Sequence, residues 1–363
     1  MLVRGARTSK SGHEAVGVSA CRSPGRPSPE VIKRMRSVQF AEFGKSEVLK
    51  LVDVERPRPK VDEVLIEMIA TGVGYVDVRT RQGAYNRAET RVGGVALPSI
   101  PGLQAVGRAV EVGGADKSLL DRKVVASLTA GACAQYFLAP SSLCAIVPEA
   151  IDDNVLAAIP MQGLTAYFML TASTRLQGGE SVLVHAAGSG VGSLAVQIAR
   201  ILGAGTIVAT AASEEKRNYA RSLGADVAID YTKAGWTETV LEATGGRGVD
   251  ILLESIGGDV FEQNFECLAR FGRYIVFGST RGLGKPVEAR RLMTKSQSLT
   301  GIYLPVFHAR PDLMQEGLRF LVDNVANGKL SLEIAATLPL EDAAKAHQML
   351  EDRSVVGAIV LRP

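Results

Sequence analysis

The sequence contains little cysteine, histidine or aromatic residue. Four cysteines and four histidines occur among 363 residues, and aromatic residues make up 5% of the chain. No two cysteines form a C-x-x-C pair, which argues against a zinc ribbon or a disulfide framework and favours buried, reduced thiols in a cytoplasmic protein. Zinc needs three or four well-placed ligands, and the histidines lie far apart, so we expect no metal site. These residues are Cys21, Cys133, Cys144, Cys267, His13, His185, His308 and His347.

The sequence also lacks a long apolar run and a strongly charged body. No run reaches the length of a membrane span, so no membrane partner is expected. The net charge of the whole chain is +3, and the first 36 residues carry +6, so the remaining residues carry −3. A mildly acidic body argues against nucleic acid as a partner. The Arg-, Ser- and Gly-rich residues 1–35 are predicted to be a disordered extension. Organellar targeting is the alternative, but Pro24, Pro27 and Pro29 argue against it.

Two rhythms of apolar residues follow the extension. Short β-rich runs broken by Gly, Pro and charged turns extend from residue 37 to about 138 and predict a small barrel-like β domain. From about residue 152, strands alternate with helices, the pattern of a doubly wound α/β domain. Its predicted strands are residues 182–185, 206–209, 227–229, 251–254, 273–277 and 299–303. A helix (313–327), a strand (333–338), a helix (340–351) and a last strand (358–361) complete the chain.

The most informative stretch is SVLVHAAGSGVGSLAVQIARILGA, residues 181–204. A short buried strand leads into a glycine-rich turn and then into an amphipathic helix that ends at Gly203. This order directs the free N–H groups of the helix at a bound pyrophosphate. Relative to G-x-G-x-x-G, Ala187 and Ser189 replace the first two glycines, and an ordinary turn of another doubly wound fold is the alternative. The predicted contacts to the dinucleotide are Gly188, Ser189, Gly190, Val191 and Gly192.

The end of the second predicted strand indicates which dinucleotide binds. An NAD site places Asp or Glu there to hold the ribose 2′-hydroxyl, but residues 209–213 read Ala-Thr-Ala-Ala-Ser. Ser213 can donate a hydrogen bond to a 2′-phosphate, and Lys216 adds a positive charge one helical turn later. Glu214 and Glu215 are expected to favour the start of the next helix, with Ser213 as its cap. NADPH is therefore the predicted cofactor.

Several ordered motifs together resemble one protein family. They are GVGYVDVRTRQGAY (72–85), PGLQAVGRAVEVG (101–113), IPMQGLTAY (159–167), the turn itself, SEEKRNYARSLGADVAIDY (213–231), GRGVDILLESIGG (246–258) and LARFGRYIVFGS (268–279). The chain resembles the medium-chain dehydrogenase/reductase superfamily, in its zinc-free, NADPH:quinone oxidoreductase-like branch. The resemblance implies a GroES-like β-barrel domain (36–158 and 308–363) and a Rossmann domain with a doubly wound parallel sheet (159–307).

The resemblance also has implications for zinc and for the loop that carries Tyr75 and Tyr85, called the substrate loop below. Zinc-containing relatives use an early Cys and a His-Glu pair in the PG motif, but this chain reads GVGYVD and Pro-Gly-Leu-Gln at these places. The family commonly has Asn where Gly74 stands, so this chain lacks one polar group of the cleft. Asp77 and Arg79 match the motif, and we interpret them as a buried ion pair that fixes the loop.

The family pattern suggests further site residues. It places Tyr231 beside the adenosine phosphate, and Gln162, Thr165, Gly278 and Ser279 against the nicotinamide. Capping of the helix that carries Tyr167 is the rival role of Gln162 and Thr165. The catalytic candidates are Tyr85 and Tyr75, for which lining an apolar cleft is the favoured alternative.

The function implied is an NADPH-dependent oxidoreductase that transfers hydride to quinones or α,β-unsaturated carbonyls. Without a metal Lewis acid, such acceptors fit because their negative charge is delocalised. The alternatives are a low-turnover NADPH-binding structural or interaction protein and an enoyl reductase. Residues 299–303, the last strand, are apolar and uncharged, which predicts a homodimer formed through this sheet edge.

Overall fold

The computed structural model describes residues 33–86, 94–114, 117–353 and 355–363. The predicted disorder of residues 1–32 lies outside this range. Strand β1 (Arg34–Gln39) pairs antiparallel with β2 (Lys50–Glu55), and Arg34 lies opposite Glu55. Residues 34 and 35 therefore belong to a strand and not to the predicted extension. Met35 is buried in the β-rich half of the chain. Among the described residues, no helix is long and apolar enough to cross a bilayer.

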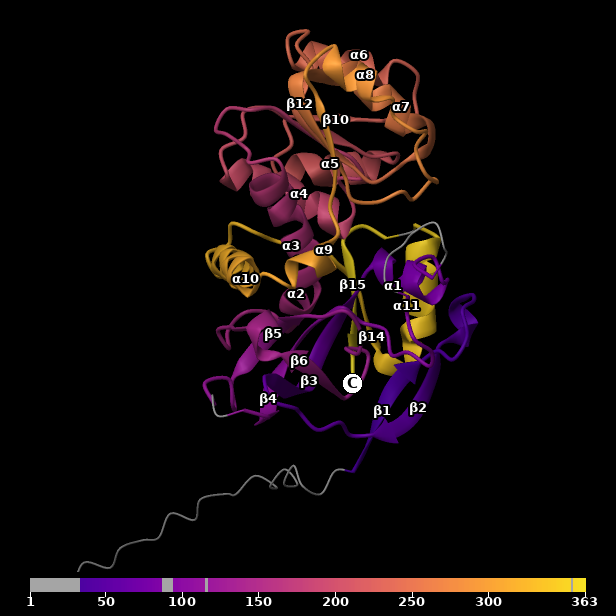
Figure 1. The fold of residues 1–363 in the computed structure, drawn as a ribbon, viewed down its shortest axis with the longest axis vertical. Coiled ribbons are helices and arrows are strands. Elements are labelled where there is room, and N and C mark those ends of the chain that lie inside the picture. Colours follow the sequence, from indigo (N-terminus) through magenta and orange to yellow (C-terminus); the bar gives the residue numbers. More distant parts are fainter. Residues whose placement is uncertain (1–32, 87–93, 115–116, 354) are drawn as a thin grey trace, which may run out of the picture. The chain divides into compact units, whose positions relative to one another are not determined.

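Six parallel strands form one sheet in the order β10-β9-β8-β11-β12-β13 (Figure 1, pink to orange). This order confirms the doubly wound dinucleotide-binding fold. The strands are β8 (Val182–Val184), β9 (Ile207–Thr210), β10 (Val227–Ile229), β11 (Val249–Glu254), β12 (Leu268–Val276) and β13 (Ser298–Gly301). The helices between them are α4 (Gly190–Ile201), α5 (Glu214–Ser222), α6 (Trp236–Ala243), α7 (Gly258–Cys267) and α8 (Ala289–Met293).

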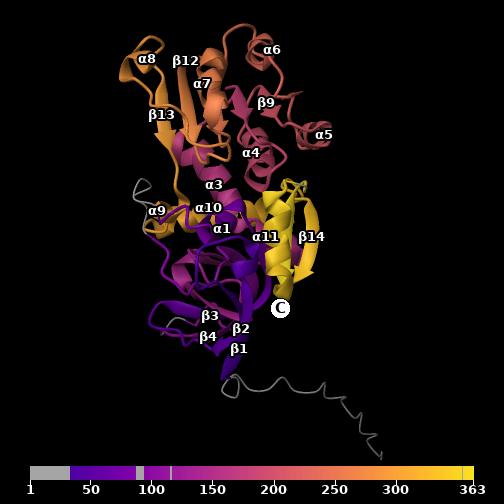
Figure 2. The same cartoon turned by 90° about the vertical axis from the view of Figure 1, so that its right-hand side faces the viewer.

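A second sheet joins strands from both ends of the chain. Its order is β14-β15-β3-β4-β5-β7, and β6 also pairs with β3. Its strands are β3 (Glu63–Val73), β4 (Gln104–Val112), β5 (Lys123–Ser127), β6 (Tyr136–Pro140), β7 (Cys144–Ile146), β14 (Ile334–Pro339) and β15 (Ala358–Arg362). Because β15 pairs antiparallel with β3, the C-terminal segment returns to the β domain as expected (Figure 2, yellow beside indigo).

The remaining helices lie around the β sheet and at its junction with the parallel sheet. They are α1 (Tyr75–Arg81), α2 (Asp153–Ala158), α3 (Pro160–Phe168), α9 (Leu304–Phe307), α10 (Pro311–Ala326) and α11 (Ala343–Glu351). A π turn (Met169–Ser173) follows α3, and 3₁₀ turns occur at Ser46–Val48, Ser141–Leu143 and Leu340–Asp342. One cluster of buried hydrophobic residues contains side chains of α2, α3, α4 and α10 together with β8 and β15. The two sheets are thus joined through packed helices.

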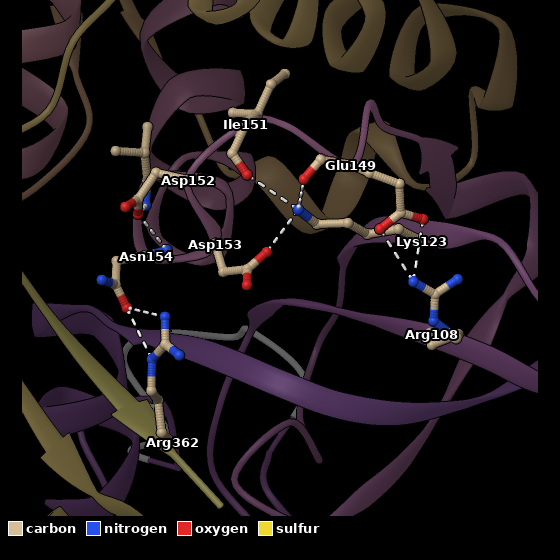
Figure 3. Close-up of polar contacts among 9 residues, drawn as sticks. Arg108, Lys123, Glu149, Ile151, Asp152, Asp153, Asn154 and Arg362 are labelled. Atoms are coloured by element: carbon tan, nitrogen blue, oxygen red, sulfur yellow. Dashed lines mark hydrogen bonds and ion pairs between the residues drawn. The ribbon is translucent and has the colours of Figure 1, made fainter. Parts of the chain in front are cut away.

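A buried lysine fixes the start of the helical junction (Figure 3). Lys123 Nζ on β5 donates to the carbonyls of Glu149 (3.2 Å) and Ile151 (2.9 Å) and lies 2.6 Å from Asp153 Oδ1. Asp152 caps α2, because its Oδ1 accepts from the N–H groups of Asn154 and Val155. Two carbonyl groups accept hydrogen bonds from the ammonium group, and the Asp153 carboxylate balances its charge, so the burial of Lys123 is compensated and the position of α2 is set.

Several predicted elements differ in their bounds from the structure, and one strand was not predicted. The strand expected at 299–303 ends at Gly301, because a helical turn containing Pro305 begins at Leu304 and leaves Tyr303 as its N-cap. The helix expected from 340 starts with a 3₁₀ turn and becomes α-helical at Ala343. The three-residue strand β7 was not predicted.

Candidate active site

The glycine-rich turn has the geometry of an anion-binding helix start. Ser189 is the N-cap of α4, and its Oγ accepts from Gly192 N at 3.2 Å. The N–H groups of Gly190 and Val191 lie in the first turn of the helix, where no intrahelical acceptor exists. Ala186, just after β8, has φ +50°, a left-handed conformation that redirects the chain from strand to helix. The turn therefore offers backbone donors and the positive end of a helix dipole.

Three glycines of the turn are packed so closely that a side chain would collide with a neighbour. A Cβ at Gly188 would lie 2.7 Å from Lys216 Cβ, and one at Gly190 would lie 1.7 Å from Gln162 Oε1. At Gly192 the neighbour is backbone, with Ala186 O at 2.3 Å. The glycines thus bring the turn into contact with α5 on one side and with α3 on the other.

Gln162 and Thr165 lie within α3, which begins at Pro160, so the rival role of helix capping is wrong for both. Thr165 Oγ1 donates to the Met161 carbonyl at 2.8 Å. Gln162 is 5% exposed, and its Oε1 has no hydrogen-bond partner among the described residues. A buried acceptor without a donor is costly, so this atom beside Gly190 fits a ligand that supplies an N–H or O–H group.

Positive charge gathers beyond the end of β9. Ser213 caps α5, with its Oγ accepting from Lys216 N at 3.3 Å, as predicted. Lys216 Nζ donates to the Arg353 carbonyl at 3.0 Å, and the Arg353 guanidinium donates to the Thr280 carbonyl at 3.2 Å. Burial lowers the pKa of Lys216; Glu215 opposes this effect and the charge of Arg353 adds to it.

Tyr231 lies at the same edge of the parallel sheet. It follows β10, and the guanidinium of Arg281 lies 5.2 Å from its ring centroid, a cation–π contact. Arg281 and Arg353 were missed from the sequence. Arg353 lies 137 residues from Lys216 in the sequence, so no local pattern indicates that the two residues meet.

Gly278 and Ser279 follow β12 and pack against the loop that follows β11. A Cβ at Gly278 would lie 3.2 Å from Ser255 Cβ, and Thr280 N donates to the Ser255 carbonyl. The buried carboxylate of Glu254 holds this second loop by accepting from the N–H groups of Ile256 and Gly257. The loops after β8, β9, β10, β11 and β12 therefore share the C-terminal edge of the sheet, where doubly wound folds bind ligands.

His185 lies under this edge with a structural role, as expected. It is fully buried, and its ring nitrogens lie 2.7 Å from Thr210 Oγ1 and 2.7 Å from Asn264 Oδ1. Both nitrogens are thus engaged within the protein. The residue supports the ends of β8 and β9 and leaves no ring nitrogen for a ligand.

The loop with the two catalytic candidates approaches α3 from the β domain. Tyr75 begins α1 and Tyr85 follows it, and both are half-buried. A Cβ at Gly74 would lie 2.7 Å from the Met161 methyl group, which places this loop next to α3. Burial raises the pKa of Tyr85, and nearby Tyr303 raises it further while Arg79 opposes the shift. Tyr303, at the start of α9, is a third aromatic side chain of this region and was missed as a site residue.

Asp77 fixes this loop, but not through the predicted ion pair with Arg79. Its two carboxylate oxygens accept from the backbone N–H groups of Gly74 (2.9 Å) and Gly102 (3.0 Å), while Arg79 is only half-buried. Both residues lie in the described part of the chain, and no ion pair joins them. Burial raises the pKa of Asp77 to about 6, against the lowering effect of these amides. Two backbone donors already satisfy the carboxylate, so a basic partner is not needed.

The comparisons with known proteins agree with this architecture. Residues 60–176 match the alcohol dehydrogenase GroES-like domain, and residues 190–322 match the zinc-binding dehydrogenase domain. Human quinone oxidoreductase is 34% identical over 334 residues, which are 91% of this chain and 98% of that protein. A 2-haloacrylate reductase of Burkholderia is 33% identical over 86% of this chain and 94% of that protein. The crystal structure of Escherichia coli quinone oxidoreductase complexed with NADPH superposes with a TM-score of 0.83 at 30% identity and covers 90% of this chain and all of that chain.

The chain combines a GroES-like domain with a Rossmann-like parallel sheet, and the glycine-rich turn lies at the C-terminal edge of that sheet. This combination is typical of dehydrogenases and reductases. The chain belongs to the medium-chain dehydrogenase/reductase superfamily, in its quinone oxidoreductase-like branch, and is an oxidoreductase. One matching family description names zinc. Within the four described ranges, no group of three or more His, Cys, Asp and Glu could hold a metal ion. Zinc independence stays a prediction.

Proposed function

We propose that the protein is an NADPH-dependent oxidoreductase that acts on quinones or on α,β-unsaturated carbonyl compounds. The observation that carries this proposal is the buried, unpartnered Gln162 Oε1 next to Gly190. A dinucleotide over the turn places polar groups beside α3, and an amide N–H there would pair this acceptor. The Escherichia coli relative in complex with NADPH supports the choice of cofactor.

Each half of the cofactor has matching residues in this chain. Gly188, Ser189, Gly190, Val191 and Gly192 present N–H groups to a pyrophosphate. Ser213, Lys216, Tyr231 and the newly found Arg281 and Arg353 surround the place of an adenosine 2′-phosphate, where β9 ends without a carboxylate. Gln162, Thr165, Gly278 and Ser279 would lie along the nicotinamide. NADPH, when bound, supplies the hydride.

Tyr75, Tyr85 and Tyr303 would form the substrate side of the cleft. The Tyr85 hydroxyl is protonated at neutral pH, as in any tyrosine, and can donate a hydrogen bond to a substrate carbonyl oxygen, but its raised pKa makes it a weaker acid. An apolar wall is the rival role, and it is the one we favour for Tyr85. In that case water protonates the reduced product, which suits a hydroquinone anion better than an enolate.

The test follows NADPH absorbance with a panel of quinones, enones and 2-haloacrylates, together with NADPH binding by fluorescence. Turnover of quinones with saturable kinetics supports the proposal. Turnover of the activated alkenes alone favours an enoyl-type reductase, which the Burkholderia relative suggests. Tight binding without turnover of any class supports the structural or interaction protein instead. Failure to bind NADPH at all would refute the cofactor assignment, and metal analysis of active protein tests zinc independence.

We also propose a homodimer. Strand β13 ends the parallel sheet and pairs only with β12 among the described strands. Its open side offers unpaired backbone groups and carries no charged residue. A second copy of the same strand, antiparallel across a twofold axis, would satisfy them.

A further inference from the structure

The C-terminal end of α11 contacts the substrate loop. Helices α1 and α11 lie side by side in both views of the structure (Figures 1 and 2). Arg81, the last residue of α1, donates from Nη2 to Glu351 Oε1 at 2.7 Å. Gln82 Nε2 donates to the same oxygen at 2.6 Å. Tyr85 follows three residues after Gln82, so Glu351 holds the base of the loop that carries it.

The residues directly after α11 contact the cofactor side of the cleft. The Arg353 carbonyl accepts from Lys216 Nζ on α5, and the Arg353 guanidinium donates to the Thr280 carbonyl after β12. Gly357 N lies 3.5 Å from the Gly188 carbonyl in the glycine-rich turn. Only Asp352 lies between Glu351 and Arg353. One short segment therefore contacts both the loop below the substrate and the residues around the adenosine phosphate.

The connection to the substrate loop depends on one carboxylate. The Arg81 side chain is fully buried, and its Nε and Nη1 have no hydrogen-bond partner among the described residues. Buried His347 lies close to Arg81, and burial, assisted by the charge of Arg81, lowers its pKa to about 3, so it stays neutral. Glu351, whose side chain is partly exposed, is thus the charge that compensates Arg81, and removing it would leave the buried guanidinium without a partner charge.

The connection to the cofactor side joins two positively charged residues. Burial lowers the pKa of Lys216, Glu215 opposes this effect, and the charge of Arg353 adds to it. The two positive groups therefore repel each other, although Lys216 Nζ donates to the Arg353 carbonyl at 3.0 Å. A phosphate that neutralises both charges would remove the repulsion and hold Arg353 against α5. The change would reach Glu351 within two residues.

We propose that Arg81 and Glu351 are positioning residues that couple the adenosine 2′-phosphate site to the substrate loop through the C-terminal end of α11. The proposal rests on the NADPH site proposed above. Binding of the 2′-phosphate tightens the loop around Tyr85, and by linkage a bound substrate tightens the binding of the phosphate.

The first experiment uses the wild-type chain and needs no catalysis. Amide hydrogen exchange is measured with 2′,5′-ADP, which carries the 2′-phosphate but no nicotinamide, and with 5′-AMP as the matched ligand without that phosphate. We expect 2′,5′-ADP to slow exchange in residues 213–217 and, by at least about fivefold, in residues 75–86. At equal occupancy, 5′-AMP should leave residues 75–86 unchanged.

Two results would overturn the coupling in different ways. Slower exchange in residues 213–217 with no change in residues 75–86 would leave the cofactor site intact and refute the coupling alone. No response in either segment would refute the NADPH site itself, and the coupling with it.

The second experiment compares two variants. Glu351→Gln removes the charge that compensates Arg81, whereas Glu262→Gln breaks the Arg291–Glu262 pair (2.6 Å) between α8 and α7, away from the segment. We expect Glu351→Gln to raise KM for quinone at least about fivefold with kcat within about twofold, and to abolish the response of residues 75–86 to 2′,5′-ADP. Glu262→Gln should change neither. Equal effects in both variants, or a loss of kcat at constant KM, would contradict the proposal. If Glu351→Gln fails to fold, the wild-type exchange experiment decides.

Discussion

Alanine substitutions at Gly190 and Gly192 test how the turn approaches the cofactor. At Gly190 the new methyl group would lie 1.7 Å from Gln162 Oε1, and the next two contacts, Cδ and Nε2, belong to the same flexible side chain. At Gly192 it would lie 2.3 Å from Ala186 O and 2.8 Å from Ala187 Cα, which are backbone atoms. The two glycines are therefore constrained by different kinds of neighbour.

These neighbours predict different costs. Gln162 can rotate away from a methyl group at position 190. Gly190→Ala therefore displaces the Gln162 side chain, which is proposed to bind the cofactor, without deforming the turn. Gly192→Ala forces the backbone at Ala186, which already has φ +50°, and overpacking of this kind costs about 1–3 kcal/mol. Strain that falls on the bound state raises the Kd for NADPH by about 5- to 150-fold.

The assay is a double-mutant cycle with Gln162→Ala, read by NADPH fluorescence titration and by thermal unfolding. Removing the Gln162 side chain makes room for the methyl group at position 190, so Gly190→Ala and Gln162→Ala should couple by about 1 kcal/mol or more. Gly192→Ala and Gln162→Ala should be additive within about 0.5 kcal/mol. Coupling of the same size in both cycles, or unchanged NADPH binding in Gly192→Ala, would refute this placement of the turn.

Four further predictions address other parts of the molecule. NADPH should bind at least about tenfold more tightly than NADH, and Lys216→Ala should narrow this gap; equal affinities in the wild type would contradict the assignment. Burial raises the pKa of Asp77 from 3.8 to about 6, so its contribution to stability is complete below about pH 4 and falls by roughly 3 kcal/mol as the pH rises through 6. Urea unfolding of Asp77→Asn should lack this decrease, and an unchanged pH profile would argue against a raised pKa. Light scattering should give a dimer mass that shifts towards the monomer when a charged residue replaces Thr300 on β13; a monomeric wild type at all concentrations would exclude this interface. Tyr85→Phe should leave kcat for quinones nearly intact, whereas a loss of about 10²-fold confined to enones would make the hydroxyl a proton donor.

The sequence predicted the parts of the site that depend on local order. The strand, turn and helix around Gly188 to Gly192 follow one another along the chain, so their spacing alone indicated a dinucleotide turn. The cap of α5 by Ser213 was predictable for the same reason, because capping uses residues three positions apart. The absence of a carboxylate after β9 could also be read directly.

The parts that were missed depend on contacts between distant segments. Arg353 reaches Lys216 only because β15 returns to the sheet beside β3, and Arg281 reaches Tyr231 only because β10 and β12 end at the same edge. The predicted ion pair of Asp77 and Arg79 is wrong for a similar reason. Gly102, 25 residues away, supplies a backbone donor that takes the place of the guanidinium, and short-range spacing contains no sign of it.

The glycine-rich turn and the loop at Gly74 are held in place by different kinds of contact. The turn is held by backbone, since Gly192 packs on Ala186 and Ser189 caps its own helix. The substrate loop instead meets α3 through a side chain, because the neighbour of Gly74 is the flexible methyl end of Met161. Met161 can move aside at little cost, so a polar residue at position 74 changes the cleft without disturbing the turn. In the proposed site, the substrate side can therefore vary while the turn assigned to the cofactor stays unchanged.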